Sequence, residues 1–178
     1  MARIKWDCPV GTPEERASDR VWCGAWVDAT GYATYYTATG KGAFHTGADL
    51  NLNKPAFDAD REAPVYACAD GVVVYAAKDS VWGKNNALIC IMHRMGNGAY
   101  VWSRYAHVIN LAVGLGDGVS RGQQIAQIGN AGGRYPYHLH FDISWIDLGA
   151  RPGDWPGADC ARLARSYVDP RRFIEVMR

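Results

Sequence analysis

Two histidines stand two residues apart in a segment, 138–145, in which polar and apolar residues alternate strictly. Such alternation predicts a β-strand whose side chains point to opposite faces in turn. The leucine, phenylalanine, isoleucine and tryptophan would face a core, and the other face would carry His138, His140, Asp142 and Ser144. The two imidazoles would have Cα atoms about 6.5–7 Å apart, so one could bind a metal ion and the other could lie beside it. The alternative interpretation is a solvated polar face.

A second candidate is His45, which precedes Asp49 by four residues. Three nearby glycines disfavour a helix, and an extended segment would present both side chains on one face. Catalytic zinc sites commonly take three nitrogen or oxygen ligands from side chains and leave a fourth position to water. This segment and one histidine of 138–145 would supply such a set. The alternative is again a polar strand face without a metal.

Two further histidines stand near the ends of expected strands. His107 follows a strand predicted over 99–106, and taken alone it is better explained as a partly buried or surface histidine than as a site residue. His93 follows a strand predicted over 85–92 and precedes a turn. We expect His93 to be a structural histidine near the surface.

The order and spacing of these motifs resemble the lysostaphin/LytM-type zinc metallopeptidases, a family of peptidoglycan endopeptidases. The resemblance rests on His45-x-x-x-Asp49, Tyr105-Ala-His107, the glycine-rich stretch 114–126, Gly129-Asn-Ala-Gly132 and His138-Leu-His140-Phe. These motifs occur in the family's order over roughly residues 43–146. The resemblance implies a fold of the duplicated hybrid motif type.

The resemblance also implies a role for each site residue. His45, Asp49 and His140 match the ligands of one Zn²⁺ ion per chain, and His107 and His138 match two active-site histidines that do not bind the metal. Zinc would acidify a water molecule and polarise the scissile carbonyl group of a peptidoglycan cross-link. One histidine would transfer protons and the other would stabilise the oxyanion, and the sequence does not distinguish them.

The sequence departs from the family where the substrate groove is expected. Tyr135 and Tyr137 stand where relatives often carry small residues, and with Asn130 they are expected to line the groove. Asp142 stands where glutamate is frequent, and we expect it to orient a histidine. All five site positions are intact, which favours an active enzyme. The alternative is a non-catalytic cell-wall binding or regulatory module on the same fold.

Short strands and turns dominate the rest of the central region. Strands are predicted over 65–69 and 72–77, where Asp70-Gly71 predicts a hairpin turn between them. Further strands over 85–92 and 99–106 flank a turn at 95–98. This pattern predicts a mainly β fold, with an antiparallel sheet or barrel-like core.

The flanking segments complete a single expected domain, 1–178. Residues 1–42 are predicted to be a coil-rich N-terminal extension that packs on the 43–146 core through its aromatic residues. The tail, 147–178, is predicted to form one or two short helices, the last of them capped by Asp169 and started by Pro170.

Composition excludes some functions. The 178 residues carry 19 basic and 18 acidic side chains, a net charge of +1, so a broad electrostatic contact with nucleic acid is not expected. No apolar run has the length of a membrane span, and the first residues lack the pattern of a secretory signal. We expect a monomer that acts on the bacterial cell wall, and the sequence leaves its localisation open.

The five cysteines include no Cys-x-x-Cys pair, which disfavours a thiolate zinc site. Cys68 and Cys90 stand in apolar runs and are expected to be buried. Cys8 and Cys23 are a candidate disulfide.

Overall fold

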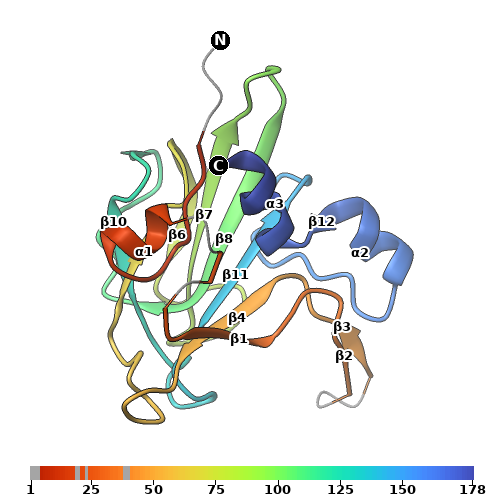
Figure 1. Cartoon of the computed structure of the whole chain (residues 1–178). Helices are drawn as coiled ribbons and strands as arrows, with labels where there is room; N and C mark the ends of the chain where they lie inside the picture. Colours follow the sequence, from red (N-terminus) through yellow and green to blue (C-terminus); the bar gives the residue numbers. More distant parts are fainter. Residues whose placement is uncertain (1–4, 19–20, 23, 38–40) are drawn as a thin grey trace.

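The computed structural model describes residues 5–18, 21–22, 24–37 and 41–178 (Figure 1). The elements in chain order are α1 (Pro13–Ala17), β1 (Trp26–Thr30), β2 (Tyr35–Tyr36), β3 (Ala43–Phe44), β4 (Ala48–Leu52), β5 (Pro64–Tyr66), β6 (Gly71–Ala77), β7 (Ala87–Arg94), β8 (Tyr100–Ile109), β9 (Gly118–Val119), β10 (Gln124–Ile128), β11 (Leu139–Ser144), α2 (Cys160–Ser166), β12 (Tyr167–Val168) and α3 (Pro170–Met177). The predicted mainly β fold is confirmed. None of the described helices is long and apolar enough to cross a membrane.

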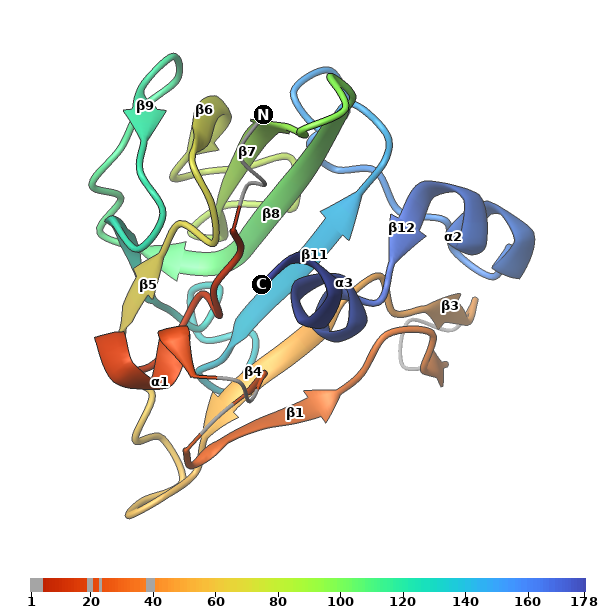
Figure 2. The ribbon, with the colours of Figure 1, turned by 45° about the horizontal axis from the view of Figure 1, so that its top comes forward.

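Ten strands form one antiparallel sheet, whose main path runs β1-β4-β11-β8-β7-β6-β9. β10 pairs with both β5 and β8, and β12 pairs with the end of β11. Figure 2 shows β4, β11 and β8 side by side in this order. Within the described residues the first and last strands of the path do not pair with each other, so the sheet does not close into a barrel. The antiparallel sheet itself is confirmed.

β11 is the predicted alternating strand, and it lies between β4 and β8. All six of its residues are buried, including His140, Asp142 and Ser144, so the polar face is not solvated. β4 and β8 pair with the two edges of β11, and the rings of Trp82 and Trp155 pack on His140 of its polar face. Trp145, which was expected in the core, lies beyond the end of the strand and is 45% exposed.

The predicted hairpin around Asp70-Gly71 is wrong. β5 pairs with β10, whereas β6 pairs with β7 and β9. Gly71 does not form a hairpin turn; it allows β6 to approach β7 closely. A Cβ atom at this position would lie 2.6 Å from both Cγ2 of Ile91 and the carbonyl oxygen of Met92 on β7.

The strands predicted over 85–92 and 99–106 are confirmed as β7 and β8, which pair along their length. His93, near the end of β7, is fully buried and does not lie near the surface as expected. Its Nδ1 lies 2.9 Å from the carbonyl oxygen of Asp70, its Nε2 lies 2.7 Å from Oγ of Ser103, and the Trp6 ring packs on it. Burial lowers the pKa of His93 to about 4.

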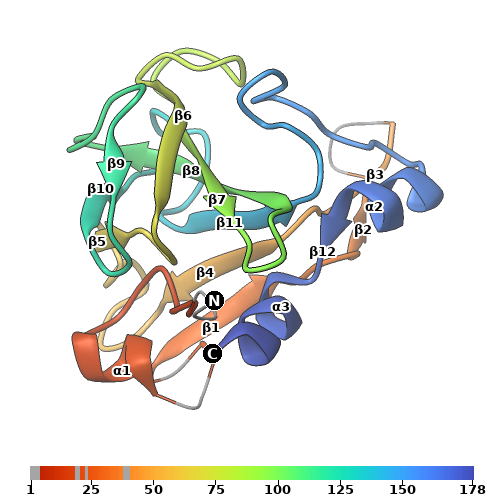
Figure 3. The ribbon, with the colours of Figure 1, turned by 90° about the horizontal axis from the view of Figure 1, so that it is seen from above.

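The C-terminal tail contains two helices, which confirms that prediction. Asp159 caps α2 and Asp169 caps α3, each by accepting backbone N–H groups of the first turn. Ile174 of α3 is buried, and Phe173 and Met177 pack against the same core. Figure 3 shows α2, α3 and β12 on one side of the molecule, away from β5, β9 and β10.

The N-terminal extension is less irregular than expected, because it contains α1, β1 and β2. α1 begins with a capping box between Thr12 and Glu15, and β1 pairs with β4. Pairing with β4 at the edge of the sheet therefore orders a segment whose glycines predicted coil. Trp26 is buried, whereas Tyr35 is half exposed.

The cysteine predictions are partly tested. Cys68 and Cys90 are buried, as expected. Cys8 is buried as well, but Cys23 lies outside the described residues, so their pairing stays a prediction.

Candidate metal centre

Three side chains from two neighbouring segments converge on one point. His45 lies directly after β3, Asp49 lies in β4, and His140 lies opposite Asp49 in β11. The approach of the two segments depends on Gly47. A Cβ atom at position 47 would collide with the carbonyl oxygen of Phe141 and would lie 2.6 Å from Cβ of Asp142. The glycine of the His-x-x-x-Asp motif therefore brings its two ends against β11.

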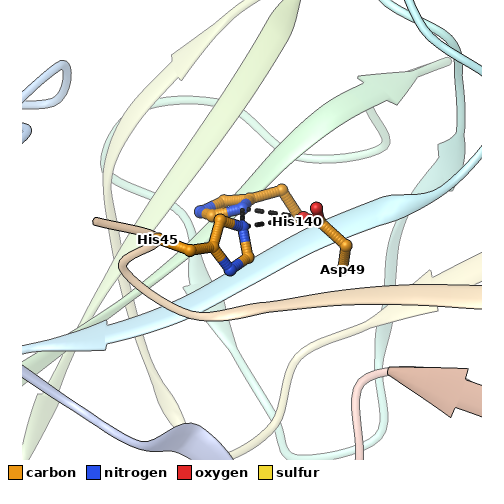
Figure 4. Close-up of side chains that lie close together, drawn as sticks. All are labelled: His45, Asp49 and His140. Carbon is orange, nitrogen blue, oxygen red and sulfur yellow. Dashed lines mark hydrogen bonds and ion pairs between the residues drawn. The ribbon is translucent and has the colours of Figure 1, made fainter. Parts of the chain in front are cut away.

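The donor atoms form a nearly regular triangle (Figure 4). His45 Nε2 lies 3.0 Å from Asp49 Oδ1 and 2.9 Å from His140 Nδ1. His140 Nδ1 lies 3.1 Å from Asp49 Oδ1. In a tetrahedral zinc site with bonds of about 2.0–2.1 Å, neighbouring ligand atoms lie roughly 3.3 Å apart. The three atoms are thus spaced as zinc ligands after a shift of a few tenths of an ångström.

The remaining nitrogens of both imidazoles are hydrogen-bonded to oxygen acceptors. His45 Nδ1 lies 3.3 Å from the carbonyl oxygen of Gly31, and His140 Nε2 lies 3.0 Å from Oδ2 of Asp142. Because these oxygens accept, the protons belong on the outer nitrogens and the inner nitrogens present lone pairs. Two lone pairs and a carboxylate oxygen pointing at one another repel unless a cation or a proton lies among them. The donor set therefore fits a metal ion.

The charge of each ionisable side chain in the site depends on burial and on its charged or hydrogen-bonding neighbours. Burial would raise the pKa of Asp49, but the neighbouring imidazoles of His140 and His45 hold it well below its ordinary value. Burial would lower the pKa of His140, but the carboxylates of Asp142 and Asp49 raise it. Burial would also raise the pKa of Asp142, yet the Arg104 guanidinium beside it lowers this pKa to about 2. The carboxylate of Asp142 therefore stays charged behind His140, where it orients the ring.

His107 and His138 lie next to this triangle. The ring centroid of His107 is 4.8 Å from that of His138 and 6.1 Å from that of His140. His107 has a φ of 62°, a left-handed conformation that L-residues rarely adopt. Its carbonyl oxygen accepts a hydrogen bond of 2.7 Å from the N–H of Gly129, which fixes this unusual backbone.

Both of these imidazoles are held as neutral bases. His107 Nδ1 donates to Oδ1 of Asn86 at 2.8 Å, and His138 Nδ1 donates to the carbonyl oxygen of Pro136 at 2.9 Å. Their Nε2 atoms are thus free of protons, and His138 Nε2 lies 3.8 Å from Oδ1 of Asp49. Burial lowers the pKa of each, and for His107 the neighbouring histidines lower it further. Both rings can accept a proton near neutral pH.

All five side chains line one cleft of about 600 Å³. Its other lining residues are mainly aromatic or small: Thr30, Tyr36, Ala43, Trp82, Asn86, Arg134, Tyr135, Pro136 and Trp155. The Trp82 and Trp155 rings meet edge to face, 5.5 Å apart, and Trp155 packs on His140 at 5.4 Å. The sequence did not indicate Trp82, Trp155 or Asn86 as site residues, because they stand in loops without a periodic pattern.

The three predicted groove residues fall in different places. Tyr135 lines the cleft, and its ring lies 5.0 Å from that of His107. Tyr137 does not line it, because strand alternation puts Tyr137 on the core face with Leu139. Asn130 is also absent from the cleft lining, and its side chain accepts a hydrogen bond of 3.0 Å from Gly133 within its own turn.

The sequence model of peptidase family M23 matches residues 43–152, which include all five of these positions. The chain belongs to peptidase family M23. Among curated proteins, this M23 chain is 35% identical over 108 residues to the peptidoglycan DD-endopeptidase ShyB of Vibrio cholerae. That alignment covers 61% of the chain and 22% of ShyB, so the chain spans less than a quarter of this relative.

Solved structures share the fold. Lysostaphin from Staphylococcus simulans superposes with a TM-score of 0.62 at 22% identity, over 99% of this chain and 56% of that one. The SpoIIQ-SpoIIIAH pore forming complex matches with a TM-score of 0.58 at 20% identity, over 80% and 84% of the chains. One of these structures is an antimicrobial peptidase and the other a pore-forming complex. The fold alone therefore does not decide the activity, which depends on the residues of the site.

Proposed function

We propose that this chain is a zinc-dependent endopeptidase that hydrolyses peptide bonds in peptidoglycan cross-links. The observation that carries the proposal is the triangle of His45, Asp49 and His140 donor atoms, 2.9–3.1 Å apart, beside two neutral imidazoles in one cleft. Membership of family M23 and the similarity to a peptidoglycan DD-endopeptidase support both the reaction and the substrate.

His45, Asp49 and His140 would hold the zinc ion. When bound, zinc would acidify a water molecule and polarise a scissile carbonyl group. Three protein ligands leave room for these partners, as in other catalytic zinc sites. The carboxylate of Asp49 offsets part of the ion's charge, and Asp142 holds the ring of His140 from behind.

His107 and His138 would handle the proton. Each has an unprotonated Nε2 and a proton fixed on Nδ1 by an oxygen acceptor. One ring would take a proton from the attacking water and deliver it to the departing amine. The other, with a proton on Nε2, would donate a hydrogen bond to the negatively charged carbonyl oxygen of the tetrahedral intermediate. Burial lowers the pKa of both rings, which favours the unprotonated form that the proton-accepting ring needs.

The cleft walls would bind the peptide. Trp82, Trp155 and Tyr135 offer aromatic faces on which peptide groups can pack, and Arg134 is a cation at the cleft that could pair with a carboxylate of the cross-link. Arg134 is tethered to one wall, because its Nη1 donates to the carbonyl oxygen of Trp82 at 3.2 Å.

Digestion of purified peptidoglycan by the zinc-loaded protein, read by mass spectrometry, tests the proposal. New amino termini within the cross-links are expected, and their masses identify the bond that is cut. The variant His107→Ala should keep the zinc and lose hydrolysis, because this ring is not a ligand. Zinc-loaded protein that binds peptidoglycan without cutting it would instead identify a non-catalytic binding module. Full activity of His107→Ala would refute the role given to this histidine.

A further inference from the structure

The sheet contains a buried cation directly behind the candidate metal centre. Arg104 lies on β8 opposite Asp142 of β11, and both side chains are fully buried. Its Nε donates to Oδ2 of Asp142 at 3.1 Å, and its Nη2 forms a close ion pair with the same oxygen. A buried guanidinium is costly unless all its donors are satisfied, so its other contacts indicate what it holds in place.

One side of the guanidinium acts on His140 through Asp142. Oδ2 of Asp142 lies 3.0 Å from His140 Nε2 and accepts a hydrogen bond of 2.7 Å from the hydroxyl of Thr46. The carboxylate is therefore held by Arg104 on one side and by the segment between His45 and Asp49 on the other. Its position sets the direction in which His140 presents Nδ1.

The other side of the guanidinium holds the cleft walls. Nη1 donates to the carbonyl oxygens of Pro152 and Asp154, at 3.1 and 2.9 Å, directly before Trp155. The guanidinium also lies over the Trp82 ring, 4.5 Å from its centroid. Trp82 and Trp155 are the two tryptophans that line the cleft. One side chain thus contacts both the partner of His140 and both of these aromatic walls.

We propose that Arg104 is a positioning residue that fixes the ligand geometry at His140 and the aromatic walls of the cleft together. This inference rests on the proposed function of the site. Only arginine offers a planar fork that can bind a carboxylate through two nitrogens while a third reaches carbonyl groups. Lysine would keep the charge but, as a single ammonium, could not hold both sides at once.

If the ion pair between Arg104 and Asp142 only stabilised the fold, replacing Arg104 would have a different effect. Its weakening would lower the stability of the fold and would leave the zinc affinity of the folded protein unchanged. A positioning role predicts weaker zinc binding in protein that remains folded. Measurements of metal affinity and ligand geometry therefore separate the two, independently of activity.

The test compares Arg104→Lys, Asp142→Asn and the double variant with the wild type. Zinc affinity is measured by competition with a chromophoric chelator, and ligand geometry by the visible absorption of the Co²⁺-substituted protein. Arg104→Lys is expected to weaken zinc binding by about 10- to 100-fold, the usual effect of losing a group that orients a metal ligand, and to change the Co²⁺ spectrum. Because Arg104 acts on His140 through Asp142, the double variant should bind zinc no more weakly than Asp142→Asn alone.

Tyr167→Phe is the matched control. It removes the hydroxyl that contacts the carbonyl oxygen of Asp154 at 2.8 Å, so it loosens the same wall without touching Asp142. Its zinc affinity should equal that of the wild type. If the wild type binds no zinc, the proposed function fails. If the wild type binds zinc and folded Arg104→Lys binds it equally well, only the role of Arg104 is overturned.

If Arg104→Lys does not fold, the variant Thr46→Val tests the positioning role of Arg104. Thr46→Val removes the hydroxyl that donates to Oδ2 of Asp142, together with its longer contacts to Nη2 of Arg104 at 3.4 Å and to Nε2 of His140 at 3.3 Å, and it leaves both contacts of Arg104 with Asp142 in place. If Arg104 suffices to hold the carboxylate, this variant keeps the zinc affinity of the wild type. A loss as large as that expected for Arg104→Lys would assign the positioning to Thr46 and would overturn the proposal.

Discussion

Replacing Gly47 by alanine should disrupt the proposed metal centre without removing any of its three candidate ligands. The added Cβ would collide with the carbonyl oxygen of Phe141 and would lie 2.6 Å from Cβ and 2.8 Å from Cα of Asp142. Ordinary carbon contacts lie at about 3.5–4.0 Å, so the segment must move from β11 by roughly 1 Å. This movement separates His45 and Asp49, on one side, from His140 on the other.

The size of the effect follows from this displacement. Metal–ligand distances tolerate changes of only about 0.2 Å, so a shift of about 1 Å should weaken zinc binding by at least about tenfold. Overpacking of this kind also costs about 1–3 kcal/mol of folding free energy. For a chain of this length that cost lowers Tm by about 2–12 °C.

Thermal unfolding with zinc and with a chelator measures both effects. The zinc-dependent rise in Tm should be smaller in Gly47→Ala than in the wild type, because stabilisation by a ligand grows with the logarithm of its concentration over Kd. Gly118→Ala is the control, since a Cβ at position 118 would meet nothing within 4 Å. A Gly47→Ala protein with the Tm and the zinc response of the wild type would refute the claim that this glycine sets the ligand spacing.

Three further outcomes are expected. His140→Ala should lose both zinc and hydrolysis, as measured by metal analysis and digestion of peptidoglycan, whereas retained zinc would contradict its role as a ligand. Burial lowers the pKa of His93 to about 4. Between pH 6.5 and about 4, the unfolded chain therefore binds a proton at His93 that the folded chain does not bind. The free energy of unfolding should fall as the pH falls through this window. His93→Gln should therefore show a flatter dependence of Tm on pH there than the wild type, and equal slopes would contradict the assignment. Burial raises the pKa of the Cys68 thiol to about 12, so iodoacetamide should label exposed Cys160 in the native protein and Cys68 only after unfolding, and mass spectrometry of the digested protein distinguishes the two.

Local sequence signals predicted the elements that carry the metal centre. The alternation of 138–145 identified β11, because a strand covered on both faces still separates its apolar residues from its polar ones. Asp169 marked the start of α3 because a capping side chain acts on the backbone within three residues. Each of these signals is complete within a few residues of the chain.

The rest depends on contacts between distant segments. Asp70-Gly71 fits a hairpin turn locally, but β5 pairs with β10 instead, more than fifty residues later. His93 resembles a surface histidine in sequence, and its burial depends on Ser103 of the neighbouring strand. Trp82 and Trp155 become cleft walls only because their rings meet each other and both pack against Arg104 and His140. No short-range pattern encodes these arrangements.

Stepwise addition of zinc to metal-free protein, with peptidoglycan hydrolysis as the readout, tests the central claim most directly. If one zinc ion held by His45, Asp49 and His140 performs the reaction, activity should be absent without metal. It should rise in proportion to added zinc and reach a plateau at one equivalent per chain. Hydrolysis by the metal-free protein, or no hydrolysis after one equivalent has bound, would contradict the account.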